Sequence, residues 1–178
     1  ANGSGKTTLL KTIAGILPPV SGEIRFLPPA VLGYVPQRDQ LDAIYLFSAF
    51  EVALMGVCGR VGAGRRIGHE EKERVHEWLR QTGADGFARQ RFAELSGGQK
   101  QRVAVARALV GNPEVVFADE PTAALDRESG ATVVHMLKRL GQLRGTTTVM
   151  VTHDSRILEL ADRIVTLEDG RIVKDTAF

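Results

Sequence analysis

The sequence predicts an α/β fold, in which a mostly parallel sheet is flanked by helices and carries an inserted helical subdomain. Apolar and β-branched runs typical of buried strands alternate with segments of helical periodicity, which is the pattern of an α/β domain. Between about residues 38 and 94 this alternation stops, and only helices are predicted. The chain has 178 residues, of which 43% are hydrophobic. We therefore expect one globular domain with its own core over residues 1–178.

The first part of the chain is predicted to contain one helix and two strands. The helix covers residues 6–14 and ends at Gly15, a residue that favours helix ends. Proline and Ser-Gly turns then lead into a short strand at residues 23–26. A second strand covers residues 31–35 and is ended by Pro36, which cannot donate a ladder hydrogen bond.

The segment from about residue 38 to residue 94 is interpreted as a helical insertion into the α/β core. Two helices are predicted in it, at residues 47–57 and 69–82, and Gly83 ends the second. A glycine-rich loop, residues 59–68, lies between them.

The rest of the chain returns to alternating helices and strands, as an α/β pattern requires. The last two strands flank Asp169 and Gly170, a pair that favours a tight hairpin turn. The predicted elements are a helix at 98–110, a strand at 115–118, a helix at 127–144, a strand at 146–151 and a hairpin of 164–167 with 171–173.

Residues 1–8 read Ala-Asn-Gly-Ser-Gly-Lys-Thr-Thr, which fits a phosphate-binding loop. Gly3 and Gly5 can take positive φ and leave room for phosphate oxygens beside bare backbone N–H groups. Lys6 can reach the β- and γ-phosphates, Thr7 can offer its hydroxyl to Mg²⁺, and the helix that follows turns its positive end toward the phosphates. An ordinary glycine-rich turn is the alternative, but the apolar helix that follows fits the loop-to-helix pattern of a P-loop NTPase.

Asp119 and Glu120 follow four apolar residues, so we expect them at the carboxyl end of a buried strand. Open parallel sheets hold their ligands at that edge. One carboxylate can bind Mg²⁺ through water while the other polarises the attacking water, as phosphoryl transfer to water needs. Asp-Glu-Pro could also be a surface turn, but Lys6 and Thr7 in the same chain favour the catalytic interpretation.

Two further polar residues follow predicted strands. Gln37 lies between a strand and the helical insertion, where its amide oxygen can touch Mg²⁺ or the attacking water and couple nucleotide state to an outer surface. By itself it would be an ordinary loop amide. His153 follows the strand at 146–151, where its imidazole can hydrogen-bond the γ-phosphate and Glu120.

The other three histidines lack the spacing of metal ligands. His69, His76 and His135 lie on predicted helices. We therefore expect each of them on a solvated helix face.

Residues 95–99 read Leu-Ser-Gly-Gly-Gln and precede a predicted helix. The N–H groups at the start of that helix, around Ser96, Gly97 and Gly98, form a second anion site. The Lys6 loop is already expected to hold the phosphates of one nucleotide. A second anion site on the same chain is therefore explained if it contacts a nucleotide bound to another copy of the chain. The sequence thus predicts a head-to-tail dimer with two ATP molecules between its subunits.

Together these motifs resemble the nucleotide-binding subunit of an ATP-binding-cassette (ABC) transporter over nearly all of the chain. The resemblance implies an ATP hydrolase whose cofactors are ATP and Mg²⁺. It implies that Glu120 is the catalytic base, that His153 is the switch histidine, and that Thr7, Gln37 and Asp119 are magnesium ligands. Nucleotide contacts are implied for Asn2, Gly3, Ser4, Gly5, Lys6, Thr7 and Thr8, and across the dimer interface for Ser96, Gly97, Gly98, Gln99 and Asp126.

The chain departs from that family at its start. The loop pattern needs a glycine one position before Ala1. In this family the strand that leads into the loop and an aromatic residue that stacks on adenine would also precede Ala1. We therefore expect the sequence to be N-terminally incomplete.

Composition limits the partners. The net charge is only +2, which gives no basic field for nucleic acid. A lone cysteine, Cys58, cannot form an internal disulfide, which fits a reducing compartment. No apolar run reaches the ~20 residues that span a bilayer. The resemblance therefore implies a separate membrane permease, a peripheral position at the cytoplasmic face of the cell membrane and, for an importer, a solute-binding protein.

Two parts of the sequence resemble different transporter groups. Residues 33–38 and 52–60 resemble the zinc, manganese and iron importers, whereas residues 117–126 and 152–158 are similar to ATPases of lipid- and macrolide-type exporters. The insertion touches the membrane partner in this family. Metal-ion import is therefore the preferred prediction, with export as the alternative.

Soluble members of the same family that act in translation or DNA repair are a further alternative. DNA-repair members insert long coiled coils, and the interval between Lys6 and Ser96 is too short for one. Translation-associated members carry two cassettes on one chain, and the importer-like insertion argues against that class.

Overall fold

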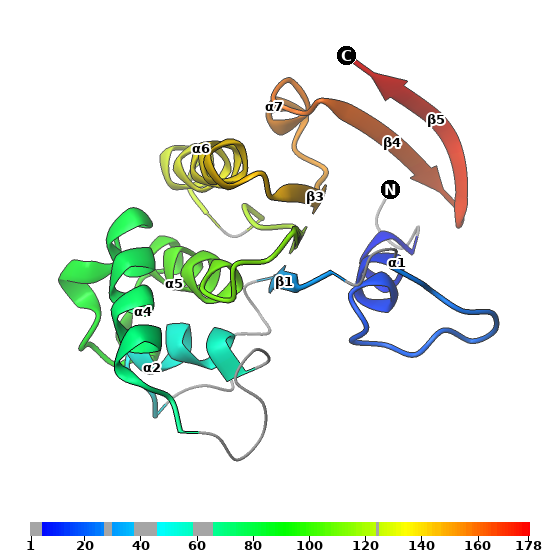
Figure 1. The fold of residues 1–178 in the computed structure, drawn as a ribbon. Coiled ribbons are helices and arrows are strands. Elements are labelled where there is room, and N and C mark those ends of the chain that lie inside the picture. The colour runs from blue at the N-terminus through cyan, green and yellow to red at the C-terminus, as the bar shows by residue number, and fades with distance from the viewer. Residues whose placement is uncertain (1–4, 27–29, 38–45, 59–65, 124) are drawn as a thin grey trace.

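The computed structural model describes residues 5–26, 30–37, 46–58, 66–123 and 125–178. At its centre is a three-stranded parallel sheet of order β1-β2-β3, formed by β1 (Leu32–Val35), β2 (Val115–Asp119) and β3 (Thr147–Val151). Helix α1 (Lys6–Ile13) lies on one side of this sheet, and α5 (Gly97–Leu109) lies on the other (Figure 1). The result is a three-layer α/β/α arrangement, as the sequence predicts.

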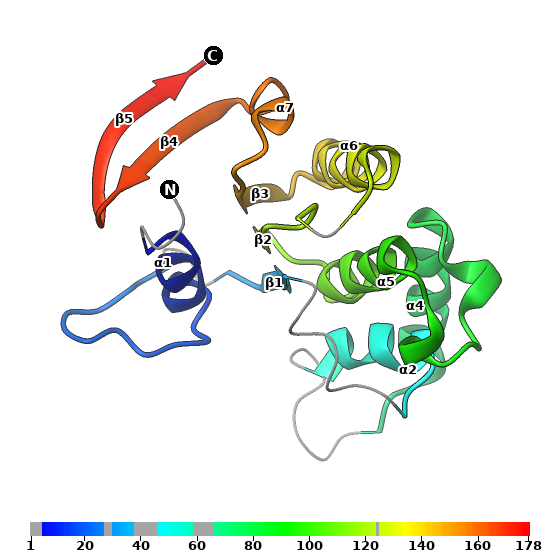
Figure 2. The ribbon, with the colours of Figure 1, turned by 180° about the vertical axis from the view of Figure 1, so that it is seen from behind.

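Strand β2 is the central strand, and its last four residues are buried. In the parallel register, Val35 of β1 pairs with Ala118, and Asp119 pairs with Val151 of β3. All three strands therefore end at the same edge of the sheet. Helix α6 (Arg127–Arg144) connects β2 to β3 and packs on the same side as α5 (Figure 2).

A group of helices lies beside α5, away from α1 (Figures 1 and 2). It contains α2 (Ala49–Leu54), the 3₁₀ turn Met55–Val57 and α4 (His69–Gln81), followed by 3₁₀ turns at Asp85–Phe87 and Phe92–Glu94. These elements bury Trp78, Leu79 and Phe92 in one core with the apolar face of α5. The helical group is therefore packed on the helix that starts at the Leu-Ser-Gly-Gly-Gln motif.

The C-terminal part begins with the short helix α7 (Ser155–Leu158) and continues as an antiparallel hairpin of β4 (Arg163–Glu168) and β5 (Arg171–Ala177). Asp169 and Gly170 form its turn, with φ of 46° and 74°. Positive φ at both central residues is the geometry that a two-residue hairpin favours. The predicted hairpin is thus confirmed, and its strands are longer than the sequence indicated.

Most predicted elements are found, but one predicted strand is absent from the described residues and one predicted helix differs in its bounds. Residues 23–26 do not form a strand; they are largely exposed, and among the described residues β1 pairs with β2 alone. An extended segment without a pairing partner gains no ladder hydrogen bonds.

The helix predicted at 47–57 begins at Ala49, because Ser48 caps it through a capping box with Glu51. It tightens into a 3₁₀ turn at Met55. Residues 59–65 of the predicted loop lie outside the described residues.

Gly56 brings the 3₁₀ turn after α2 into direct contact with the backbone of α5. A Cβ at Gly56 would overlap the carbonyl oxygen of Arg107, whereas a Cβ at Gly86, in another 3₁₀ turn, meets no atom within 4 Å. We expect Gly56→Ala to lower the free energy of unfolding by about 1–3 kcal/mol, because backbone must move to make room. Urea unfolding measures the change.

Gly86→Ala is the matched control, and it should alter the unfolding free energy far less. Equal free energies of unfolding for the two variants would contradict the close contact between Gly56 and the backbone of α5.

Candidate active site

The phosphate-loop motif leads into α1 through Gly5. Gly5 is the residue before the helix and has φ of 84°, a left-handed conformation that glycine adopts without strain. Lys6 and Thr7 are half-buried in the first turn of α1, and Thr8 is exposed. No side chain of the described residues caps this end, so its backbone N–H groups are available to an anion. The predicted contacts Asn2, Gly3 and Ser4 lie outside the described residues.

Asp119 is the buried carboxylate at the end of β2, and it is fully inaccessible to solvent. The Thr7 hydroxyl donates to its Oδ1 at 2.8 Å, and the Tyr34 hydroxyl donates to its Oδ2 at 3.3 Å. Side chains from α1, β1 and β2 thus meet at one carboxylate. The sequence predicts Thr7 and Asp119 as ligands of one magnesium ion, but it does not predict the contact of Tyr34 with Asp119.

Tyr34 reaches Asp119 because of the strand register. Tyr34 pairs with Phe117, and Asp119 lies two residues further along β2, on the same face of the sheet. Burial, together with the negative charge of Asp119, raises the pKa of the Tyr34 phenol. The phenol is therefore a hydrogen-bond donor at neutral pH. This contact depends on how β1 pairs with β2. The sequence of neither strand alone reveals that register.

Glu120 turns away from the strand. Its φ is 46°, an uncommon left-handed value for a residue other than glycine, and its N–H donates to the carbonyl of Val151 at 2.9 Å. Such backbone strain, of the order of 1–3 kcal/mol, is found at functional sites. The turn directs the Glu120 side chain toward the loop after β3, where His153 lies.

The two carboxylate oxygens of Glu120 have different surroundings. Oε1 lies 2.9 Å from Nδ1 of His153. Oε2 is buried and has no hydrogen-bond partner among the described residues. A buried acceptor without a partner is costly and is a place for a bound water or ligand group. Glu120 can therefore hold a water molecule through Oε2 while His153 fixes Oε1.

Gln37 lies two residues beyond the end of β1 and is half-buried. Since the strands are parallel and end together, the structure places Gln37 at the same edge of the sheet as Asp119 and Glu120. That position agrees with the one expected from the sequence.

The Leu-Ser-Gly-Gly-Gln motif forms the start of α5. Ser96 is the N-cap: its Oγ accepts from the Gln99 N–H at 3.3 Å, and the Ser96 N–H donates to Gln99 Oε1 at 2.8 Å. Gly98 lies against Ser129 of α6, so that a Cβ at Gly98 would lie 3.1 Å from the Ser129 hydroxyl. Within the described part of the chain, no hydrogen bond joins this motif to Thr7 or Glu120. Because α1 and α5 lie on opposite sides of the sheet, the two predicted anion sites belong to different parts of one chain (Figure 1).

Asp126 is exposed and caps α6. Its Oδ1 accepts from the backbone N–H groups of Ser129, at 2.9 Å, and Glu128, at 3.1 Å. The bonds from Ser129, and to a smaller extent the one from Glu128, hold the pKa of Asp126 below its ordinary value. In a single chain, Asp126 therefore serves as a helix cap.

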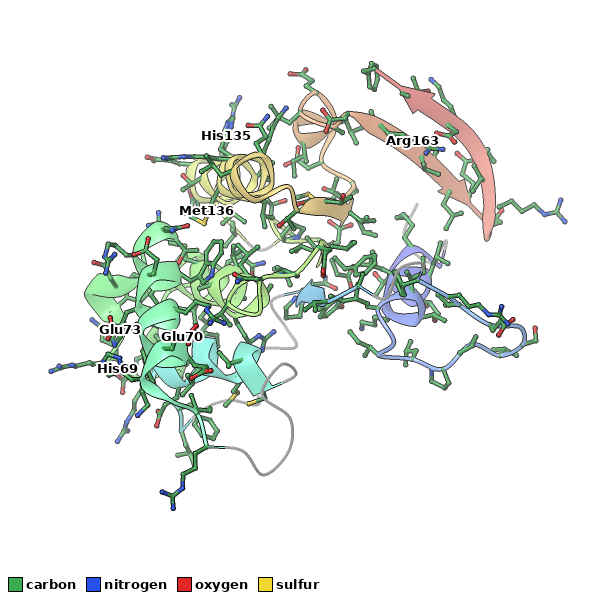
Figure 3. The ribbon with its side chains drawn as sticks, viewed as in Figure 1. His69, Glu70, Glu73, His135, Met136 and Arg163 are labelled. Carbon is green, nitrogen blue, oxygen red and sulfur yellow. The ribbon has the colours of Figure 1, made fainter. Side chains whose placement is uncertain are left out.

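The remaining histidines lie away from this site. His69 is on α4 beside Glu70 and Glu73, and His135 is on α6 (Figure 3). His76, on α4, is also exposed, and its ring lies 4.6 Å from that of Phe50. All three stand on solvated helix faces, as expected. Among the described residues, no group of three or more His, Cys, Asp or Glu side chains is arranged to hold a metal ion.

The sequence matches the ABC transporter family over residues 1–123. It is 40% identical to a zinc transport system ATP-binding protein of Treponema pallidum (strain Nichols), over 99% of this chain and 68% of that protein. It is 37% identical to a lipoprotein-releasing system ATP-binding protein of Syntrophotalea carbinolica, over 97% of this chain and 80% of that protein.

Among solved structures, the fold is similar to a dimeric ATP-binding cassette in a post-hydrolysis state bound to ADP and Pi. The TM-score is 0.84 at 34% identity, over 99% of this chain and 82% of that one. Several curated relatives are longer, and the chain spans half to four fifths of the length of those it matches. No helix among the described residues has the length and apolar character needed to cross a membrane.

The cap at Asp126 generates a pH-dependent prediction. Because the folded-state pKa is depressed, the charge of Asp126 stabilises the fold above the ordinary pKa that the group has in the unfolded chain, and this contribution is lost as the pH falls through the lower folded-state pKa. Asn is an equally good N-cap without the charge. We expect Asp126→Asn to have the lower thermal midpoint at pH 7 and the difference to vanish in the acid range.

Thermal unfolding of both proteins across this pH range measures the effect. Glu168→Gln, a change at an exposed carboxylate of the hairpin, is a control for the loss of one negative charge. A difference between Asp126→Asn and the parent protein that grows as the pH falls would contradict the cap geometry.

Proposed function

We propose that this chain, which belongs to the ABC transporter family, binds and hydrolyses ATP as the nucleotide-binding part of a transporter. The observation that carries the proposal is the Glu120 carboxylate, which has one oxygen fixed by His153 and the other buried without a partner. It stands next to the buried Asp119, which accepts a hydrogen bond from Thr7. Two adjacent carboxylates in different surroundings suit one metal ligand and one base.

The nucleotide phosphates would lie at the amino end of α1. Lys6 supplies a positive charge there, and the N–H groups of the first turn point at the same place. We assign Gly5, Lys6, Thr7 and Thr8 to phosphate binding, together with Asn2, Gly3 and Ser4 of the preceding loop. This placement puts the terminal phosphate near the carboxyl ends of β1, β2 and β3.

The residues at this edge fit Mg²⁺. Thr7 and Asp119 offer hard oxygen atoms 2.8 Å apart, and Mg²⁺ prefers oxygen ligands with some positions left to substrate phosphates and water. Gln37 offers a further amide oxygen at the same edge. When bound, the ion neutralises charge on the phosphates during transfer. The chain's own contribution is to hold these oxygens in place.

Glu120 acts on the attacking water in this proposal. Oε2 accepts one proton of the water and orients its oxygen toward the terminal phosphate. His153 fixes the carboxylate through Oε1 and can donate a hydrogen bond to a phosphate oxygen through its other ring nitrogen. The strained backbone at Glu120 keeps the carboxylate at the sheet edge rather than in line with β2.

A second copy of the chain completes the site in this proposal. Ser96, Gly97, Gly98 and Gln99 start a helix whose N–H groups can receive an anion, yet this helix lies on the opposite side of the sheet from α1 of the same chain (Figure 1). A head-to-tail dimer would bring these residues, and Asp126, to the nucleotide held by the partner. The fold's similarity to a dimeric cassette supports this arrangement.

The transporter context is proposed from the relatives. A separate membrane permease would anchor the chain at the cytoplasmic face of the cell membrane, with residues from about 38 to 94 as the helical insertion that contacts it. Import of a metal ion such as zinc or manganese, with a solute-binding protein, is the first candidate, because a relative is named for zinc transport. The similar lipoprotein-releasing protein keeps export as the second candidate. A soluble family member without a permease is the third.

The base assignment predicts the effect of Glu120→Gln in the full-length protein. ATP binding should persist because the shape is kept, while the steady-state hydrolysis rate should fall by about 10²–10⁴-fold because the base is lost. The variant should also accumulate as an ATP-bound dimer. Phosphate release measures hydrolysis, and size-exclusion chromatography with ATP measures the dimer.

Glu73→Gln, on the exposed face of α4, is the matched control and should hydrolyse ATP at the parent rate. Turnover of Glu120→Gln within a few-fold of the parent protein would remove Glu120 from the role of base.

The dimer predicts complementation between two inactive variants. In a mixed dimer of Ser96→Arg with Lys6→Ala, one site combines an intact Lys6 with an intact Ser96, and the other site holds both defects. The mixture should therefore hydrolyse ATP faster than either variant alone. Steady-state phosphate release after mixing measures the recovery.

The control is a mixture of Lys6→Ala with Glu120→Gln. Both changes lie on the same half of a site, so the mixed dimer has no intact site and should not recover. Recovery in the control as well, or in neither mixture, would contradict the head-to-tail arrangement.

A further inference from the structure

We infer that Tyr34 is a positioning residue for Asp119, and that its hydroxyl fixes the orientation of the Asp119 carboxylate plane relative to Thr7 and the magnesium position. This inference rests on the proposed function, because it assigns Asp119 to the metal. The contact that carries it is the hydrogen bond from the Tyr34 hydroxyl to Asp119 Oδ2, at 3.3 Å. Tyr34 would not itself touch the metal or the phosphates.

Asp119 needs such a partner because of its burial. The carboxylate is inaccessible to solvent, and an ionised group that is removed from water must be paired or hydrogen-bonded. The Thr7 hydroxyl satisfies Oδ1, at 2.8 Å. The Tyr34 hydroxyl gives Oδ2 a second donor, from a different element of the fold.

The two donors fix the orientation of the carboxylate from two sides. Without Tyr34, Oδ2 would lose this donor, and the Thr7 bond alone would constrain the carboxylate plane less. With Tyr34 in place, Oδ2 is held toward β1 and Oδ1 is held toward α1. Residues that orient a metal ligand in this way affect metal affinity without contacting the ion.

The backbone around Tyr34 is itself fixed. The preceding residue, Gly33, lies so close to α5 that a Cβ there would overlap the carbonyl oxygen of Ala108. The charge of Arg107, also on α5, lowers the pKa of the Tyr34 phenol, against the larger effects of burial and Asp119. The backbone that carries Tyr34 is thus held against α5, while its phenol lies on the other face of β1 and reaches the carboxylate at the end of β2.

The sign of the effect of Tyr34→Phe distinguishes positioning from simple electrostatics. Loss of a donor makes the Asp119 carboxylate more negative, which by itself would strengthen Mg²⁺ binding. Loss of orientation would weaken it, and changes to residues that orient metal ligands typically cost 10–100-fold in affinity. Because the Tyr34 bond is long at 3.3 Å, we expect the lower end of that range.

The test is calorimetric titration of the full-length protein with a non-hydrolysable ATP analogue, once with excess Mg²⁺ and once with a chelator. Tyr34→Phe should bind the analogue without metal within about two-fold of the parent protein. With Mg²⁺ its affinity should be about 10-fold lower. The Mg²⁺ concentration for half-maximal ATP hydrolysis should rise in parallel.

Thr146→Val is the matched control, because it removes a part-buried hydroxyl bond, from Thr146 to the carbonyl of Pro113, at the opposite end of β3. A merely structural loss would affect both variants alike, whereas the inference requires a magnesium-specific loss in Tyr34→Phe alone. Unchanged or tighter Mg²⁺-dependent binding in Tyr34→Phe, while the parent protein gains affinity from Mg²⁺, would overturn the role of Tyr34 only. No gain from Mg²⁺ in the parent protein would overturn both this inference and the proposed function.

Discussion

The arrangement of the site depends on one constraint, which is the buried negative charge of Asp119. A carboxylate that is removed from water must find donors, and here they come from Thr7 on α1 and Tyr34 on β1. The Thr7 bond also joins the amino end of α1 to the carboxyl end of β2. The requirement to satisfy one buried carboxylate therefore also brings the proposed phosphate-binding end of the helix close to the residue proposed as the base.

Glu120 shows how adjacent residues in sequence acquire different chemistry. Asp119 is the last residue of β2 and stays in the sheet, whereas Glu120 takes a left-handed φ and bonds to the end of β3. One carboxylate thereby has a hydroxyl donor on each oxygen, and the other has a buried oxygen without a hydrogen-bond partner among the described residues. Different surroundings of this kind are what separate a metal ligand from a base.

The residues assigned to the partner's nucleotide have a second role within their own chain. Ser96 and Gln99 form a capping box, and Asp126 caps α6. These bonds stabilise the helix ends, and the first turn of α5 keeps further backbone N–H groups for the proposed anion site. A motif that is already ordered before the subunits meet loses less conformational entropy when it closes on a nucleotide.

The sequence by itself determined the α/β class, the principal helices and strands, and the residue types of the site, because glycine patterns, helix caps and apolar periodicity act over a few neighbouring residues. It also placed Asp119 and Glu120 at a strand end, because a buried apolar run must end in a polar residue there. It could not determine that residues 23–26 lack a strand partner, that Glu120 leaves the strand direction, or that Tyr34 reaches Asp119. Those features depend on pairing register and on contacts between segments far apart in the chain, which only the tertiary structure decides.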